Sequence, residues 1–143
     1  MKNILLLLAI ISVFLVGCGP GKVSMLDERA KGTATAYHGE LDAMLADMRL
    51  LLSGGNIPPY KVDDGIKKGY ILPPTGWGDP YTKAFMLVPV RGIAANGVEV
   101  DAYALEISVT SSDAINVSKT LANHYYTILK RAFESKYPVV RVK

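Results

Sequence analysis

Two segments of the chain repeat apolar side chains with the period of an α-helix. The first covers residues 26–53, where one face carries Tyr37, Leu41, Met44, Leu45, Met48, Leu51 and Leu52. Ser53-Gly54-Gly55 follows as a stop signal, because glycine adopts the left-handed conformation that ends many helices. One glycine and two threonines in residues 26–36 lower the helix propensity. We therefore expect this helix to begin late or to fray at its start.

The second helical segment covers residues 112–133. Its apolar stripe consists of Leu121, Tyr125, Ile128, Leu129, Ala132 and Phe133. Ser111-Ser112-Asp113 offers an N-cap before it. Lys130 and Arg131 lie near its C-terminal end, where the helix dipole favours cations.

Residues 84–92 and 98–109 have the composition of β-strands. Both are rich in branched and aromatic side chains, and the second alternates apolar and polar positions. Asn96-Gly97 between them is a strong signal for a hairpin turn. Pro89 indicates a sheet edge or a bulge, because proline lacks the N–H that a ladder needs. Residues 139–142 are predicted to form a last short strand.

Residues 54–83 separate the first helix from the first of these strands and are rich in glycine and proline. A short helix fits residues 62–68, and the remainder is predicted to be a long loop. Loops of this length in compact domains are commonly functional.

The order of elements is thus helix, long loop, hairpin, helix and strand, which predicts an α+β domain. We expect the N-terminal helix to pack on a small antiparallel sheet, with the second helix before the last strand. The length of 143 residues suits one domain, and 50% hydrophobic with 20% charged residues indicates a folded chain. The net charge of +3 comes from scattered basic residues, which argues against a nucleic-acid partner.

At the N-terminus, an apolar run from Ile4 to Val16 follows a positively charged start. A transmembrane helix needs about 20 apolar residues, so this run is too short to span a bilayer. It fits the central region of a secretory signal. The run ends in Leu15-Val16-Gly17-Cys18, which resembles the lipobox of bacterial lipoproteins. A plain signal peptide with an incidental cysteine is the alternative.

The lipobox resemblance implies that Cys18 is diacylated on sulfur, that the chain is cut before it, and that the new amine is acylated. Several acyl chains anchor a protein stably where one anchors it marginally. Residues 1–17 would then be a cleaved lipoprotein signal peptide, 18–24 a lipidated tether and 25–143 a single α+β globular domain. Gly19, rather than Asp, follows the cysteine, which favours the outer membrane facing the periplasm over the inner membrane.

No arrangement of side chains in the sequence predicts catalysis. His38 and His124 each lie in a predicted helix without a catalytic motif around them. Adjacent acids such as Asp63-Asp64 lack the alternating spacing of a calcium loop and are typical of a solvated turn. The single Cys18 excludes an intrachain disulfide and a cysteine-based metal cluster. We therefore predict no catalytic residue, no metal and no cofactor.

The segment from Leu72 to Tyr81 stands out because it contains the only tryptophan and leads directly into a strand. One interpretation is a turn whose aromatic side chains close the edge of the core. The other is a contact surface for a partner protein, since tryptophan and tyrosine are frequent interface anchors. Trp77, Asp79 and Tyr81 are the candidate contact residues.

The motif Gly76-Trp77-Gly78-Asp79-Pro80-Tyr81, with the order of elements, resembles the globular domain of type IV pilins, especially type IVb pilins and pseudopilins. The resemblance covers about residues 36–142 and implies a helix packed on an antiparallel sheet. Three features depart from the family. Cys18 and Lys22 stand where the processed pilin stalk has an apolar residue and a glutamate, and the C-terminal cysteine pair is missing. The resemblance therefore implies a lipid-anchored accessory protein, not a polymerising pilin.

Three functions remain open at this point. The first is a non-enzymatic envelope lipoprotein that docks to a component of a type IV pilus, secretion or conjugation apparatus through its loop and sheet edge. The second is a periplasm-facing lipoprotein binding module unrelated to pili, which assists assembly or handles a ligand. The third is a small periplasmic hydrolase, although no general base is placed near a nucleophile. We favour the first, with the membrane reached through the lipid on Cys18.

Overall fold

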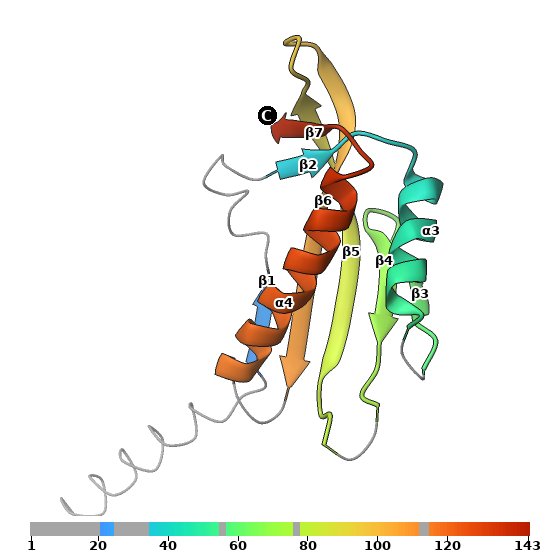
Figure 1. Cartoon of the computed structure of the whole chain (residues 1–143), viewed down its shortest axis with the longest axis vertical. Coiled ribbons are helices and arrows are strands. Elements are labelled where there is room, and N and C mark those ends of the chain that lie inside the picture. Colours follow the sequence, from blue (N-terminus) through green and yellow to red (C-terminus); the bar gives the residue numbers. More distant parts are fainter. Residues whose placement is uncertain (1–20, 25–34, 55–56, 76–77, 112–114) are drawn as a thin grey trace, which may run out of the picture.

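The structure is a computed structural model and describes residues 21–24, 35–54, 57–75, 78–111 and 115–143. Within these ranges it contains two helices and seven strands (Figure 1). In chain order they are β1 (Gly21–Ser24), β2 (Thr35–Tyr37), α3 (Leu41–Leu52), β3 (Tyr60–Asp63), β4 (Lys68–Leu72), β5 (Thr82–Ile93), β6 (Glu99–Ser111), α4 (Ile115–Glu134) and β7 (Val139–Val142). The α+β class is confirmed, as are the second helix and the last strand.

The long hairpin of β5 and β6 forms the central part of an antiparallel sheet. The strand order is β1-β6-β2-β7-β5-β4-β3, with β5 and β6 also paired to each other. The hairpin turns at Asn96-Gly97, as predicted, because Gly97 adopts a φ of +81° that other residues rarely reach. The side chain of Asn96 supports the turn by accepting a hydrogen bond from the backbone N–H of Val98 at 3.1 Å.

At one end of the hairpin, four strands close into a ring. β2 pairs with both β6 and β7, and β7 pairs in turn with β5. The ring is filled by small side chains, namely Ala36, Ala102, Ala104 and Val140. A Cβ atom on Gly92 would lie 2.5 Å from Cγ2 of Val140, so this close approach requires glycine.

Pro89 lies inside β5, which is a central strand of the sheet. β5 has a β4 partner only as far as Leu87 and a β7 partner only from Gly92 onward. Pro89 lies in the gap between these two ladders, so its missing N–H costs no ladder hydrogen bond there. On this side β5 is therefore an edge strand only between Leu87 and Gly92.

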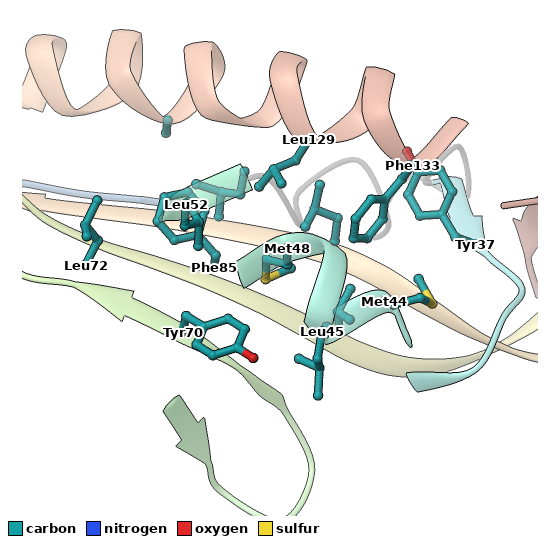
Figure 2. Packing of buried hydrophobic residues seen from close by; sticks show 14 of the residues in the cluster. Tyr37, Met44, Leu45, Met48, Leu52, Tyr70, Leu72, Phe85, Leu129 and Phe133 are labelled. Carbon is teal, nitrogen blue, oxygen red and sulfur yellow. The ribbon is translucent and has the colours of Figure 1, made fainter. Parts of the chain in front are cut away.

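Both helices contribute to one apolar core against one face of β4, β5 and β6. Figure 2 shows side chains from α3, α4 and the sheet meeting in this layer. The rings of Phe85 and Tyr125 meet edge to face at 5.2 Å, and those of Tyr37 and Phe133 at 5.4 Å. Buried apolar side chains of this size are the main source of stability in a domain of this length.

Three expectations about secondary structure are corrected by the structure. The first helix begins at Leu41, and Tyr37 belongs to β2, because Ala36 and Tyr37 find partners in both β6 and β7. The tether was expected to include residues 18–24, but residues 21–24 form β1 and pair with β6.

The third correction concerns the short helix expected over residues 62–68. β3 and β4 form a hairpin there instead. Gly65 takes a φ of +84° at the turn, and the carboxylates of Asp63 and Asp64 accept backbone hydrogen bonds from Gly65 and Ile66, both at 3.0 Å. These local hydrogen bonds favour a turn over a helix.

Candidate functional site

The loop between β4 and β5, residues 73–81, is organised around one carboxylate, and we call it the Asp79 loop. Asp79 Oδ2 accepts hydrogen bonds from Thr75 Oγ1 at 2.8 Å and from Lys83 Nζ at 2.6 Å. The backbone N–H groups of Thr75 and Tyr81 donate to the same carboxylate at 3.3 and 3.2 Å. Asp79 therefore joins both arms of the loop to the start of β5.

The electrostatics of Asp79 follow from these contacts. Burial raises the pKa of this carboxyl. This effect is outweighed by the hydrogen bonds from Lys83, Thr75 and Tyr81 and by the charge of Lys83, which together lower the pKa to about 2. Lys83 is only 4% exposed, so the ion pair neutralises an ammonium group that has little access to water. Asp79 therefore stays ionised at neutral pH and cannot exchange protons there as a general acid.

The candidate contact residues Trp77, Asp79 and Tyr81 thus lie in different settings. Trp77 falls outside the residues that the structure describes. Asp79 makes its hydrogen bonds within the loop and to Lys83, and Tyr81 is half-buried and packs against the main core. Their role as a contact surface stays a prediction, while the structural role of Asp79 is plain from its geometry.

A second feature is a hollow between α3 and the C-terminal end of α4, which we call the α3–α4 groove. It has a volume of about 250 Å³. The lining residues are Asp47, Leu50, Leu51, Ala132, Phe133, Ser135 and Lys136. Leu50 is 73% exposed and Leu51 44% exposed, so the groove presents apolar side chains to solvent.

The sequence of α3 explains why these leucines are exposed. Successive residues of a helix point about 100° apart, so Leu50, Leu51 and Leu52 cannot all face the core. The core takes Leu52 together with Met44, Leu45 and Met48. Ile128 lies one turn before Ala132 and is 44% exposed, which extends the apolar surface along α4. The expectation that Leu51 and Ile128 belong to the core stripes is therefore wrong.

One end of the groove is held by a second carboxylate, Asp47. It accepts hydrogen bonds from Lys136 Nζ at 2.8 Å and from the hydroxyl of Tyr137. These bonds lower the pKa of Asp47, while burial and the neighbouring carboxylate raise the pKa of Tyr137 to about 12. The contacts hold the segment that follows α4 against the middle of α3, at one end of the groove.

Neither histidine occupies a catalytic arrangement in the described part of the chain. His38 follows β2, not a helix, and its Nδ1 lies 2.7 Å from the carbonyl oxygen of Asp101. His124 is an exposed residue of α4 whose ring meets that of Tyr125. Within the described ranges, no three or more His, Cys, Asp or Glu side chains gather as metal ligands would.

One half-buried ion pair could not be predicted from the sequence. Lys67 Nζ and Glu106 Oε2 lie 2.8 Å apart on the face of the sheet opposite the helices, and Glu106 is 9% exposed. The two residues are 39 positions apart, and no local motif marks either of them. The exposed leucines had a usable signal, because three leucines in a row exceed what one helical stripe can bury.

Cys18 lies outside the described residues. Among the helices that the structure describes, none combines the length and the apolar character needed to cross a membrane. Comparisons with protein-family models, with curated protein sequences and with solved structures give no match for this chain. The proposed function is therefore based on the lipobox and on the two surface features described above.

Proposed function

We propose that this chain is a non-enzymatic, lipid-anchored protein of the cell envelope that acts by binding another protein. Within the envelope, it acts as an accessory or structural component of a type IV pilus, secretion or conjugation apparatus. The lipobox at Cys18 supports the location. The observation that carries the binding role is the α3–α4 groove, where Leu50 is 73% exposed beside a concave apolar surface.

The energetics of the groove support protein contact. Burying a leucine side chain that was exposed contributes about 2 kcal/mol, so covering Leu50, Leu51 and Ile128 would contribute several kcal/mol before the cost of association. Concave apolar sites that take up a large side chain are where binding energy concentrates in protein interfaces. Lys136 and Asp47 at the end of the groove supply polar groups for the rim.

The assignment to a pilus, secretion or conjugation apparatus rests on the resemblance to type IVb pilins. Its supports are the motif from Gly76 to Tyr81, the hairpin with Asn96-Gly97 and a second helix before the last strand. This part of the proposal is tested by the identity of the partner.

One observation favours the alternative, a periplasm-facing lipoprotein binding module unrelated to pili. β1 and β2 both lie in the sheet between Cys18 and the start of α3. In the pilin family, a helix continues without a break from the membrane anchor. In this chain residues 35–37 form a strand, so the helix is not continuous there.

The decisive experiment is photocrosslinking from the groove in the native cell. A photoreactive phenylalanine derivative replaces Leu50, and the matched control places it at Val98, which is 55% exposed in the turn of the β5–β6 hairpin. We expect one envelope protein to be captured from position 50 and not from position 98. A pilus, secretion or conjugation component supports the full proposal, and a different envelope protein supports the alternative.

Equal capture from both positions, or none from position 50, would contradict protein binding at the groove. Mass spectrometry of the purified protein tests the anchor separately. We expect acyl chains on Cys18 and no residue before it, and a chain that retains residues 1–17 without acylation would contradict the envelope-lipoprotein assignment.

A further inference from the structure

β3 (Tyr60–Asp63) is the last strand on one side of the sheet. It pairs with β4 and, among the strands that the structure describes, with no other. Figure 1 shows it beyond β4, on the side away from β5. An uncovered strand of this kind presents backbone N–H and C=O groups to which another strand can bind.

The β3–β4 turn shows which residues of β3 have these groups free. The N–H of Asp64 donates to the carbonyl of Lys67 at 3.2 Å, so these two residues form a hydrogen-bonded pair. Such pairs alternate with non-hydrogen-bonded pairs along an antiparallel ladder, and the next one is therefore at Val62. Lys61 and Asp63, which flank Val62, direct their N–H and C=O groups away from β4.

The side chains of Lys61 and Asp63 place one positive and one negative charge on the same face of β3. Lys61 is paired with Tyr70, a residue of the main core, so this is the face that the helices cover. Lys61 is exposed, and no ion pair or side-chain hydrogen bond joins it to another described residue. The side chain of Asp63 is 48% exposed and lies 3.6 Å from Lys68. A strand added at this edge can therefore offer Lys61 an anionic partner.

Charge and hydrogen bonding together select one way in which two copies of β3 can pair. A two-fold axis through Lys61 would set two ammonium groups opposite each other, and it would place Pro59, which has no N–H, opposite Asp63. An axis through Asp63 would set two carboxylates opposite each other. An axis through Val62 places Lys61 of each copy opposite Asp63 of the other. Each of these pairs then exchanges two backbone hydrogen bonds.

We propose that two copies of this chain associate through antiparallel pairing of their β3 strands, with the two-fold axis at Val62. Tyr60, which is 63% exposed, then lies opposite Asp64 of the second copy, beside the turn where Ile66 is 69% exposed. Facing residues share one face of a sheet, so the helices of both copies cover the same side of the combined sheet. The dimer therefore carries two α3–α4 grooves on that side.

The test traps this contact with a disulfide, because a four-residue strand buries little surface and the association is expected to be weak. Val62→Cys in the full-length chain places two cysteines on the axis. Their Cα atoms would be about 4.5 Å apart, which a disulfide can bridge. The matched control is Lys61→Cys, whose two cysteines are offset by about 7 Å along the strands and lie beyond disulfide reach.

Native cells that produce each variant are oxidised with copper phenanthroline, and linked dimer is measured on non-reducing gels. We expect about fivefold more dimer from Val62→Cys than from Lys61→Cys. The original chain, whose only cysteine is Cys18, gives the background. Mass spectrometry of the linked peptides checks that the bond joins position 62 of both copies.

The charge at position 61 tests the register. In the Val62→Cys chain, adding Lys61→Asp sets carboxylates opposite each other, and we expect about fivefold less linked dimer. Lys61→Arg keeps the charge and should leave the yield unchanged. Because the side chain of Lys61 is exposed, neither change removes a contact within the fold. Equal yields from these two variants would contradict the pairing of Lys61 with Asp63.

Three other results would overturn the inference. Equal dimer from Val62→Cys and Lys61→Cys would indicate random collision. No dimer from Val62→Cys, in protein with an unchanged circular dichroism spectrum, would show that β3 does not self-pair. A disulfide from Val62→Cys to a different protein would show that a partner's strand binds β3 instead. None of these results bears on acylation of Cys18 or on capture from Leu50, so the inference and the proposed function fail separately.

Discussion

Asp79 and Asp47 hold opposite parts of the molecule with similar sets of partners, a lysine ammonium and a hydroxyl. They differ in the burial of the lysine. Lys83, the partner of Asp79, has a side chain that is 5% exposed, whereas the side chain of Lys136, the partner of Asp47, is 59% exposed. The contribution of such a pair to stability therefore depends on whether the ammonium can reach water once the carboxylate is removed. The ammonium group of Lys136 can be hydrated by solvent, whereas that of Lys83 stays buried.

The largest expected effect is therefore that of Asp79→Ala. Removing the carboxylate leaves the ammonium of Lys83 buried without its partner, and we expect the free energy of unfolding to fall by about 3–5 kcal/mol. Denaturant unfolding followed by circular dichroism measures this loss. Adding Lys83→Met to Asp79→Ala should restore most of the stability, because the buried charge is then gone. An equal loss in the single and double variants would contradict the comparison.

The second expected effect is on acid stability. The pKa of Asp79 is about 2 in the folded protein and about 3.9 in the unfolded chain. A lowered folded pKa contributes stability above pH 4 that is lost as the pH falls toward 2. We expect this contribution to be about 1–2 kcal/mol after solvent screening. Unfolding measured between pH 5 and 2 should be less pH-dependent in Asp79→Asn than in the original protein.

A smaller effect is expected from Thr75→Val, which removes the hydroxyl that donates to Asp79 at 2.8 Å. The carboxylate keeps its lysine, so we expect a loss of about 1 kcal/mol, the usual worth of one hydrogen bond. Thr75→Ser keeps the hydroxyl and serves as the control, with stability close to that of the original protein. The same loss in both variants would show that the methyl group, not the hydrogen bond, matters.

The smallest effect is expected for Asp47→Ala, at or below about 1 kcal/mol, because Lys136 can reach solvent when the carboxylate is gone. The clearer signal is spectroscopic. The pKa of Tyr137 is about 12 beside Asp47, and removal of that negative charge should lower it toward 10. Ultraviolet titration of tyrosinate, compared between Asp47→Ala and the original protein, measures the change. An unchanged titration would contradict the contact.

The networks around Asp79 and Asp47 also differ in how far they could be predicted from the sequence. Thr75, Asp79 and Lys83 are spaced by four residues in a segment already singled out, so this network lies within reach of local reasoning. The α+β class, the hairpin at Asn96-Gly97 and the helix before the last strand also follow from local patterns. Asp47 and Lys136 are 89 residues apart, and only the tertiary fold brings them together.

The errors have the same origin. β2 is three residues long and owes its conformation to two neighbouring strands, one of them near the far end of the sequence. Tyr37 therefore fits a helical stripe on paper and a strand in the fold. The hairpin of β3 and β4 escaped prediction because its turn, Asp64-Gly65, is one of several glycine and proline signals in residues 54–83, which together predict a long loop and not a strand pair.

The ring of four strands, β6, β2, β7 and β5, has a consequence for the order in which the chain can fold. β7 consists of residues 139–142 of a chain of 143, and it fills the place between β2 and β5. The backbone N–H of Lys143 itself donates to the carbonyl of Arg91 at 2.9 Å. Contacts between such distant parts of a sequence form slowly. A chain still emerging from a ribosome or a translocation channel thus holds an open sheet until residues 139–142 are released.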